Sequence, residues 1–440
     1  MKGISLWNKA TDLIIGGNSL LSKRPTRYCS SQWPTYYKEA KGIEIKDLNC
    51  ISYKDFSEFS IGCNILGYRP KMHFKVLNYL RKSPPLTTLN SPMEVYLADK
   101  LNTFFSFDNV WRFTRGGGEA LALACRYARA ISTKSNVLSL GYHGWHDWYL
   151  SANLISNQGL DKVFLTGLDP FGIHKNLSGT SFSCSPNSPL DISQAITDFD
   201  IGIVFIESAR YELLPSESVA ILKNFQDNHG IIVSDEVTSG FRFPRKLACL
   251  ELDISPDIVV LGKALGGGWP LSAIGVKNSY KSICEDVFAS STFWSEQSGF
   301  IASSLFLDTI ADWDKFYSNL AACGSLLRNA FIYAMDGKNI KFSINSIPTM
   351  ISHSCQFGDF SQRESSAILC YRMLKENYLY STTSYVSAAH TPSNIKRFSL
   401  FLSKCVDSIL YDMQHDSDIL TNELALFGYL EVGFSRTQKL

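Results

Sequence analysis

The feature that most constrains this chain is Lys263, which lies between an apolar run and a run of glycines. Residues 257–261 have the length and β-branched content of a buried strand, and Gly266 to Gly268 follow the lysine. Lys263 is therefore predicted just past a strand end, where open α/β sheets bind ligands. Two interpretations fit these residues equally well. In one, burial lowers the pKa of the amine and makes it a nucleophile; in the other, the lysine is solvated beside a turn.

A second apolar run ends in an acid and favours the first interpretation. Residues 231–237 predict another buried strand, and their Asp235 precedes Lys263 by 28 positions (263 − 235), enough for one helix or loop between neighbouring strands. A lysine and a carboxylate at neighbouring strand ends are what pyridoxal phosphate needs. The lysine binds the aldehyde as a Schiff base, and the carboxylate keeps the pyridine nitrogen protonated so that the ring acts as an electron sink.

Two segments carry a resemblance to a known family. They are Asp235-Glu236-Val237 with Gly240-Phe241-Arg242, and the run from Gly262 to Gly268. In this order and spacing the chain resembles class III, fold type I pyridoxal-phosphate aminotransferases, and among them the glutamate-1-semialdehyde 2,1-aminomutase-like branch. The resemblance covers about residues 10–415. It implies an α/β fold with a mainly parallel central sheet in a large domain, and a smaller α+β domain built from both termini. Within the first segment it assigns Asp235 and Val237 to the cofactor site.

The order of the expected elements agrees with that fold. From about residue 110 to 276 strands and helices alternate, which is typical of a mainly parallel sheet with helices on both faces. A small antiparallel sheet is expected at 36–60, and mixed strands and helices after about 310. The expected domains are an N-terminal part of the small domain at 1–80, the large cofactor-binding domain at 81–310, and a C-terminal small domain at 311–440. Expected helices include 4–15, 119–130, 299–306, 313–335, 364–375 and 392–413, and a late strand is expected at 385–390.

A glycine turn leads into one of these helices. Gly116, Gly117 and Gly118 follow a strand and precede the helix that starts at Glu119. A turn of this kind exposes amide N–H groups and directs the positive end of the helix dipole at an anion. The resemblance implies that the turn binds the cofactor phosphate. Glycine replaces the hydroxyl residue that the family has here, so backbone donation remains and one side-chain bond to the phosphate is lost.

An aromatic and histidine-rich motif follows the next expected strand. It spans residues 141–148, Gly-Tyr-His-Gly-Trp-His-Asp-Trp. The resemblance places Tyr142 on the face of the pyridine ring and assigns His143 to the same signature. We expect Trp145, His146 and Trp148 to line or close the pocket. Histidine and aspartate this close together also occur in metal sites, but no further ligand cluster accompanies them. We therefore expect no metal.

Three further candidates follow, of which Glu207 and Thr292 come from the resemblance. Glu207 ends the apolar run 201–206, and the resemblance places it near the ring hydroxyl of the cofactor. Arg210 is a candidate for binding a substrate anion, with a solvated loop arginine as the alternative. Thr292 lies in a segment that, in the family, reaches the phosphate of the neighbouring subunit's cofactor, which implies a homodimer. The alternative for Thr292 is an ordinary Ser/Thr loop before the next helix.

Departures from the aminomutase pattern bear on the reaction. Ser19 matches a serine that binds the substrate carboxylate in that enzyme, but the arginine expected three residues later is Ser22, and the gating glutamate falls on Thr382. Lys23 and Arg24 are alternatives for that arginine, although neither has its register, and a basic surface loop is the alternative for the segment. These differences favour transfer between separate molecules. We expect an aminotransferase that uses Lys263 to move an amino group from an amino-acid donor to a carbonyl acceptor in a specialised biosynthetic pathway. An aminomutase and a catalytically silent binding partner are the alternatives.

Composition excludes several classes of partner. The 440 residues include 42 Lys and Arg against 41 Asp and Glu, so the chain has no basic footprint for nucleic acid or a membrane surface. No apolar run reaches the ~18–20 residues of a membrane-spanning helix, and the N-terminus lacks the apolar core of a signal peptide. Eleven cysteines occur without a Cys-x-x-Cys, which indicates reduced thiols. We expect a cytoplasmic protein.

Overall fold

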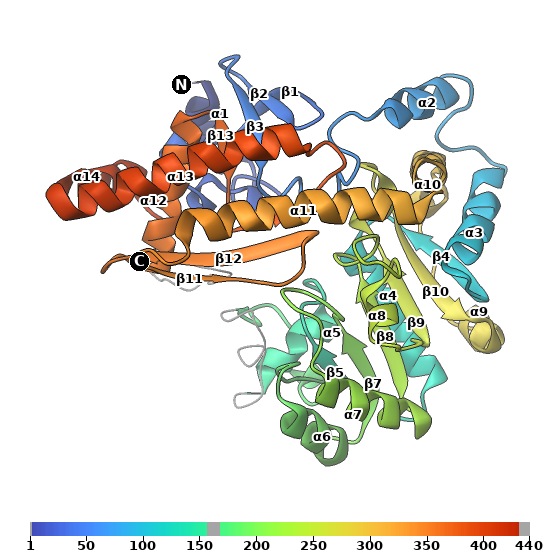
Figure 1. Ribbon diagram of the computed structural model, residues 1–440. Helices are drawn as coiled ribbons and strands as arrows, with labels where there is room; N and C mark the ends of the chain where they lie inside the picture. The colour runs from blue at the N-terminus through green and yellow to red at the C-terminus, as the bar shows by residue number, and fades with distance from the viewer. Residues whose placement is uncertain (1, 156–167, 431–440) are drawn as a thin grey trace. The chain divides into compact units, whose positions relative to one another are not determined.

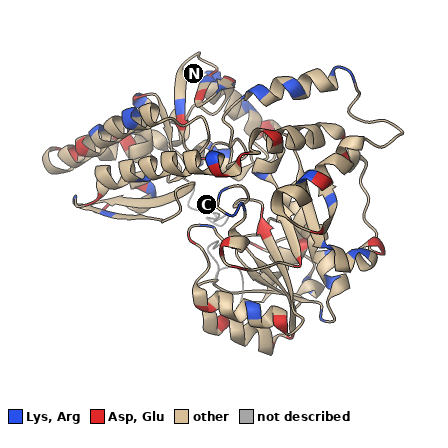
Figure 2. Cartoon of the chain, turned by 45° about the vertical axis from the view of Figure 1, so that its right-hand side comes forward, with Lys and Arg blue, Asp and Glu red and all other residues tan. Residues whose placement is uncertain are grey.

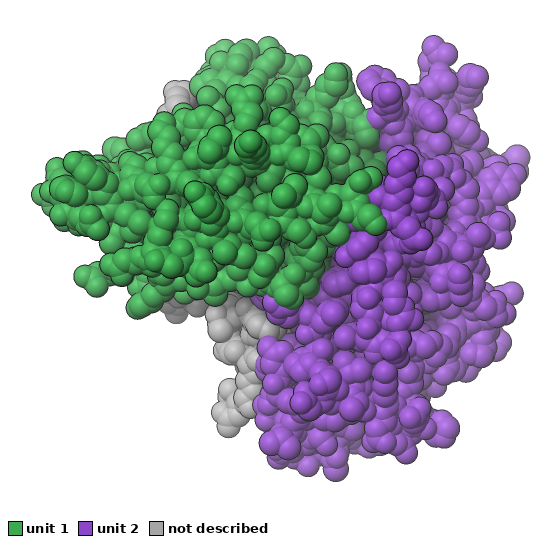
Figure 3. Space-filling model, viewed as in Figure 1, with its two compact units in different colours: residues 1–70, 318–432 green, residues 71–317, 433–440 purple. Residues whose placement is uncertain are grey.

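A computed structural model describes residues 2–155 and 168–430 of the chain (Figure 1). The chain divides into two compact units, shown in different colours in Figure 3. Unit 1 contains residues 1–70 and 318–432, and unit 2 contains residues 71–317. Lys and Arg are interspersed with Asp and Glu along both units (Figure 2). Each unit has its own sheets, and unit 2 contains the strands that the candidate residues follow.

Unit 2 is built on a seven-stranded sheet with the order β4-β10-β9-β8-β7-β5-β6. β10 is antiparallel to both of its neighbours, and every pairing from β9 to β6 is parallel, which confirms the mainly parallel sheet. The residues of β7, β8 and β9 are buried along their whole length, as strands covered on both faces must be. The strands are β4 Asn109–Thr114, β5 Asn136–Leu140, β6 Ser181–Ser183, β7 Ile201–Ile206, β8 Ile231–Glu236, β9 Ile258–Leu261 and β10 Ser272–Lys277.

Helices of unit 2 begin where the local sequence supplies caps and small residues. The hydroxyl of Ser91 caps α3 by accepting from the amide of Met93, with Pro92 in the first turn. α4 buries the small side chains of Ala120, Ala124 and Ala128, which let it lie close against β8, β9 and β10. The helices are α2 Lys71–Leu80, α3 Pro92–Phe105, α4 Gly117–Ile131, α5 Asp147–Leu150, α6 Pro189–Asp198, α7 Ser216–Asp227, α8 Ala248–Glu251, α9 Lys281–Glu285 and α10 Gln297–Thr309.

Unit 1 joins segments from both ends of the chain in one sheet. β1 Tyr37–Lys41, β2 Glu44–Asp47 and β3 Ser52–Phe56 are antiparallel, as expected, and β13 Tyr378–Tyr380 adds to β3 in parallel. This pairing confirms a small α+β unit built from both termini. A second sheet contains β11 Ile340–Ile344, β12 Met350–Phe357 and β14 Thr383–Tyr385. The helices are α1 Lys2–Leu13, α11 Trp313–Met335 (which begins in unit 2), α12 Gln362–Lys375, α13 Pro392–His415 and α14 Asp418–Phe427.

The strand expected at 385–390 shares only Tyr385 with the observed strand β14 Thr383–Tyr385. β14 ends at Tyr385, and residues 386–390 form an irregular turn instead of continuing the strand. The amide of Ser387 donates to Nδ1 of His390 at 3.0 Å, and the amide of Ala388 donates to the carbonyl of Ile65 at 2.8 Å. Side-chain acceptors of this kind compete with ladder hydrogen bonds, which explains the early end. The sequence pattern also gave no sign of α14.

A buried histidine in unit 1 links the stability of the fold to pH. The ring of His353 on β12 stacks on Phe331 with centroids 4.3 Å apart, and its Nε2 lies 2.7 Å from the hydroxyl of Tyr380. Burial lowers the pKa of His353 to about 3. The folded state therefore holds the neutral ring, whereas the unfolded chain takes up a proton near pH 6.5.

We predict that His353 makes the folded state less stable in acid. The stability it contributes is fully present above pH 6.5 and is lost as the pH falls toward 3, by about 1.4 kcal/mol per pH unit. His353→Asn keeps a polar group but cannot take up the proton. Its unfolding temperature should fall less steeply between pH 7 and pH 5 than that of the wild type. His229→Asn, at an exposed position, should follow the wild-type slope. Equal slopes for the wild type and His353→Asn would contradict the prediction.

Candidate functional site

The parallel strands bring most of the predicted residues to one edge of the unit 2 sheet. β4, β5, β7, β8 and β9 run in the same direction, so their carboxyl ends meet at that edge. The candidates there are Gly116–Gly118 after β4, Tyr142 and His143 after β5, Glu207 after β7, Asp235 at the end of β8, and Lys263 after β9. The arrangement places a lysine, carboxylates, an aromatic ring and a glycine turn along one sheet edge.

Asp235 and His143 form a buried pair. Both side chains are almost fully buried, and Nδ1 of His143 lies 2.9 Å from Oδ2 of Asp235. The other carboxylate oxygen accepts from the amide of Val237 at 3.0 Å. These contacts orient the carboxylate. Within the described part of the chain, Nε2 of His143 is buried and has no hydrogen-bond partner.

Lys263 stands in an unusual backbone conformation. It opens the 3₁₀ turn η7 Lys263–Gly266 with φ +43°, in the left-handed region that non-glycine residues rarely adopt. Residues in such conformations cluster at functional sites, where the surroundings hold them in place. The half-buried side chain donates from Nζ to Oγ1 of Thr238 at 2.7 Å. Sequence reasoning missed Thr238; its only signal was a hydroxyl residue directly after the strand that carries Asp235.

Val237 connects the lysine turn with the glycine turn. A Cβ atom on Gly117 would lie 2.9 Å from Cγ1 of Val237, and one on Gly262 would lie 3.2 Å from the same atom. Neither glycine therefore has room for a side chain unless Val237 moves, and at Gly262 the hydroxyl of Ser272 is closer still, at 2.9 Å. The turn at Gly116 is closed by Glu119, whose Oε2 accepts from the amide of Arg115 at 3.0 Å. Val237 thus packs against Gly117 at the start of α4 and against Gly262, the residue before Lys263.

Glu207 joins two other candidates through its carboxylate. Its Oε2 accepts from the amide of Tyr142 at 3.1 Å, and both oxygens accept from Nη1 of Arg210 at 3.0 and 3.2 Å. The Arg210 guanidinium carbon lies 5.5 Å from the centroid of the Tyr142 ring. Gly141, with φ +133°, leaves no space for a side chain, because a Cβ there would lie 2.6 Å from Cβ of Glu207. The charge of Arg210 is paired with Glu207, and its role toward a substrate anion stays a prediction.

The turn that contains Thr292 is fastened to the glycine turn. Thr292 opens η9 Thr292–Ser295 and is exposed. Nε1 of Trp294 donates to Oε1 of Glu119 at 2.7 Å. The Arg115 guanidinium donates to the main-chain carbonyls of Phe293, Trp294, Glu296 and Pro270. Arg115 was not singled out from the sequence, because its acceptors lie more than 150 positions away.

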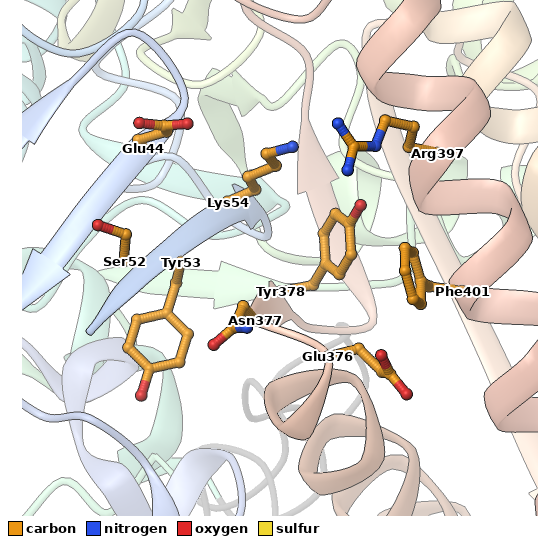
Figure 4. Close-up of a pocket in the computed structure, with 9 residues that line it drawn as sticks. All are labelled: Glu44, Ser52, Tyr53, Lys54, Glu376, Asn377, Tyr378, Arg397 and Phe401. Atoms are coloured by element: carbon orange, nitrogen blue, oxygen red, sulfur yellow. The ribbon is translucent and has the colours of Figure 1, made fainter.

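Ser19 and Trp145 are the two remaining predicted residues. Ser19 is an exposed residue of unit 1. Trp145 is 68% exposed and stacks on His146 with centroids 4.2 Å apart. Their substrate roles stay predictions. Unit 1 also has a pocket of about 320 Å³, drawn in Figure 4, which is lined by Glu44, Ser52, Tyr53, Lys54, Glu376, Asn377, Tyr378, Arg397 and Phe401. None of the predicted site residues lines it.

The residues at the sheet edge fit pyridoxal phosphate. A buried, oriented carboxylate suits a protonated ring nitrogen, and a lysine amine at the next strand end suits an aldehyde. The first turn of α4 offers amide donors to a phosphate. Nδ1 of His146, buried and without a hydrogen-bond partner among the described residues, lies beside Gly118 in that turn. Asp235, Lys263 and the first turn of α4 thus offer groups that suit the ring nitrogen, the aldehyde and the phosphate, respectively.

Neither a spanning helix nor a metal cluster accompanies the site. None of the helices described here combines the length and the apolar character needed to cross a membrane. Over residues 2–155 and 168–430, no three His, Cys, Asp or Glu side chains are grouped so that they could hold a metal ion. All eleven cysteines are free thiols.

Sequence comparison places this chain among known aminotransferases. Residues 213–356 match the family model described as "Aminotransferase class-III". A 3-aminobutyryl-CoA aminotransferase of Cloacimonas acidaminovorans is 26% identical over 331 residues, which cover 73% of this chain and 76% of the relative. A glutamate-1-semialdehyde 2,1-aminomutase of Methanococcoides burtonii is 25% identical over 421 residues, covering 90% of this chain and 96% of the relative.

Solved structures share the fold. The FumI protein of Sphingopyxis sp. MTA144, in its PLP internal aldimine form, has a TM-score of 0.82 at 22% identity and covers 95% of this chain and 99% of its own. A glutamate-1-semialdehyde aminomutase of Pseudomonas aeruginosa has a TM-score of 0.76 at 16% identity, with 92% and 94% covered. These likenesses support the fold type I architecture.

Proposed function

This chain belongs to the class-III aminotransferase family, whose cofactor is pyridoxal phosphate, and from that premise we propose that it moves an amino group from an amino-acid donor to a separate carbonyl acceptor. We place this transfer in a specialised biosynthetic pathway. The observation that carries the proposal is the pair of neighbouring strand ends that hold Asp235 and Lys263. A catalytically silent relative would not need both groups.

The chain's own residues divide the work between them. Lys263 would hold the cofactor covalently through Nζ, and after its release Nζ would move a proton between the substrate carbon and the cofactor, as general base and then as general acid. Asp235, oriented by His143, would bind the ring nitrogen. When bound, the cofactor withdraws electrons from the carbon that carries the amino group. Thr238 lies within hydrogen-bond distance of Nζ and would steer the amine between these positions.

Other residues would bind the cofactor without taking part in proton transfer. The amide groups of the first turn of α4 would hold the phosphate, and Tyr142 would cover one face of the ring. Val237 packs beside both turns. Glu207 would lie on the side of the ring hydroxyl, and Arg210 beside it would meet a substrate anion.

Two positions support transfer over exchange within one molecule. A mutase must retain its intermediate while the amino group changes carbon, which requires a clamp on the substrate. The clamp arginine and the gating glutamate of the aminomutase correspond to Ser22 and Thr382 here, and neither side chain has a charge. A transferase instead releases a keto product and admits a second substrate. The aminomutase remains the second candidate, because a relative with that name aligns with 90% of the length of this chain.

We expect Lys263→Ala to abolish covalent cofactor binding without unfolding the protein, because Lys263 is only half-buried. Treatment with borohydride followed by mass spectrometry should find the cofactor on Lys263 of the wild type and on no residue of the variant. Lys281→Ala, at an exposed position, should behave as the wild type. A reduced adduct on another lysine in the wild type would refute the assignment.

We expect the loaded enzyme to release a keto acid when it is mixed with a suitable amino acid and no acceptor, in an amount equal to the enzyme present. Amino acids of different charge, with glutamate first, should be compared by chromatography of the products. The reason is that a transferase completes its first half-reaction without a second substrate. Efficient isomerisation of glutamate-1-semialdehyde, with no keto acid released from any donor, would instead support the mutase.

We also propose a homodimer in which Thr292 serves the partner's cofactor. The exposed Thr292 stands on a firmly anchored turn beside the exposed rings of Phe288 and Phe293, and apolar surface of this kind indicates a binding partner.

Lys263→Ala and Thr292→Asp should each impair the enzyme. Unfolding and refolding the two variants together should restore about a quarter of wild-type activity, because half of the dimers are mixed and each has one intact site. A fully active monomer in sedimentation would contradict the proposal.

A further inference from the structure

The ring of His146 fills the space that a side chain at residue 118 would need. Gly118 is the second residue of α4 Gly117–Ile131, and its helical backbone would accept any side chain. A Cβ atom there would lie 3.1 Å from both Cε1 and Nδ1 of His146, closer than most carbon atoms approach in proteins. The imidazole therefore takes the position that a side chain at residue 118 would otherwise occupy. The neighbouring Gly117 is blocked by Val237, at 2.9 Å, and not by a polar group.

The orientation of His146 is held by its surroundings. Its ring stacks on the indole of Trp145 at an angle of 26°. Its carbonyl accepts from the amides of Tyr149 and Leu150 at 3.0 and 3.1 Å, so the residue is anchored at the start of α5. Burial lowers the pKa of His146, which favours the neutral ring at physiological pH. A neutral ring has one N–H group to donate.

The nitrogen that faces Gly118 lacks a partner. Nδ1 of His146 is buried and makes no hydrogen bond to any residue that the structure describes. A buried polar atom left unpaired is costly, so its persistence points to a ligand. The first amides of α4, directly beside it, have no acceptor within the helix and attract an anion.

We propose that His146 donates a hydrogen bond from Nδ1 to the phosphate of the cofactor and so replaces the hydroxyl side chain that Gly118 lacks. The inference rests on the proposed function, since it needs the phosphate to lie at the first turn of α4. Gly118 and His146 then form a matched pair. The glycine makes room for the ring, and the ring supplies the bond that a serine or threonine at residue 118 would make.

The first experiment compares two ligands that differ only in the phosphate. The full-length chain is freed of cofactor, and the dissociation constants of pyridoxal phosphate and of pyridoxal are measured by absorbance titration. For His146→Ala the affinity for pyridoxal phosphate should fall at least about tenfold, as expected for a hydrogen bond to a charged group. The affinity for pyridoxal should stay within about twofold of the wild type, because pyridoxal has no phosphate to lose a bond to. His229→Ala is the control.

A second readout uses the phosphorus atom itself. The ³¹P resonance of the bound cofactor should shift in His146→Ala and return toward its wild-type position in His146→Asn, whose side-chain amide can donate from nearly the same place as Nδ1. If His146 only fills space, the alanine variant will weaken both ligands equally and leave the ³¹P resonance unmoved. That outcome would overturn the inference.

The matched pair predicts a reciprocal rescue. Gly118→Ser alone should weaken cofactor binding, because its Cβ and hydroxyl press on the imidazole. The double variant G118S/H146A should regain affinity to within about threefold of the wild type, because the new hydroxyl has both room and the phosphate within reach. If the binding free energy lost by the double variant equals the sum of the losses of the two single variants, the inference is overturned. If borohydride reduction finds no cofactor bond at Lys263 of the wild type, the proposed function fails. That measurement does not involve His146, so a failure of the proposed function is distinguishable from a failure of this inference.

Discussion

The parallel pairing of β8 with β9 is the interaction on which the candidate site depends. Asp235 lies opposite Val260 and Glu236 opposite Leu261, so the chain leaves the two strands side by side. Because side chains alternate along a strand, a shift of one residue would turn Asp235 away from the site. The distance between carboxylate and lysine is thus a consequence of strand register.

A second acid secures the segment that follows β8. Glu236 is fully buried, and its carboxylate accepts from the hydroxyls of Ser234 and Ser239 and from the amides of Ala248 and Cys249. Four donors offset much of the cost of burying the charge, although burial still raises the pKa of Glu236. The network fixes the chain on which Val237 and Thr238 lie. Asp235 and Glu236 are adjacent, yet Asp235 pairs with His143 whereas Glu236 binds the main chain of a later segment.

Arg115 performs the corresponding task at the opposite end of the site. Its guanidinium binds main-chain carbonyls of the segment after Thr292, and its amide binds Glu119 at the start of α4. Charged donors to carbonyls make stronger hydrogen bonds than neutral ones. One arginine therefore links the glycine turn at the start of α4 with the Thr292 turn.

Local sequence determined the elements of this protein and their order. Apolar runs marked β7, β8 and β9, a Ser-Pro pair marked the start of α3, and the spacing of Asp235 and Lys263 indicated neighbouring strand ends with the chemistry of pyridoxal phosphate. These features depend on residues a few positions apart, so periodicity and capping reveal them. The tertiary structure alone decided that Thr238 meets Nζ, that Arg115 reaches the Thr292 turn, and that His146 fills the space left by Gly118. Such contacts depend on strand register and on packing between segments far apart in the chain, which no local pattern contains.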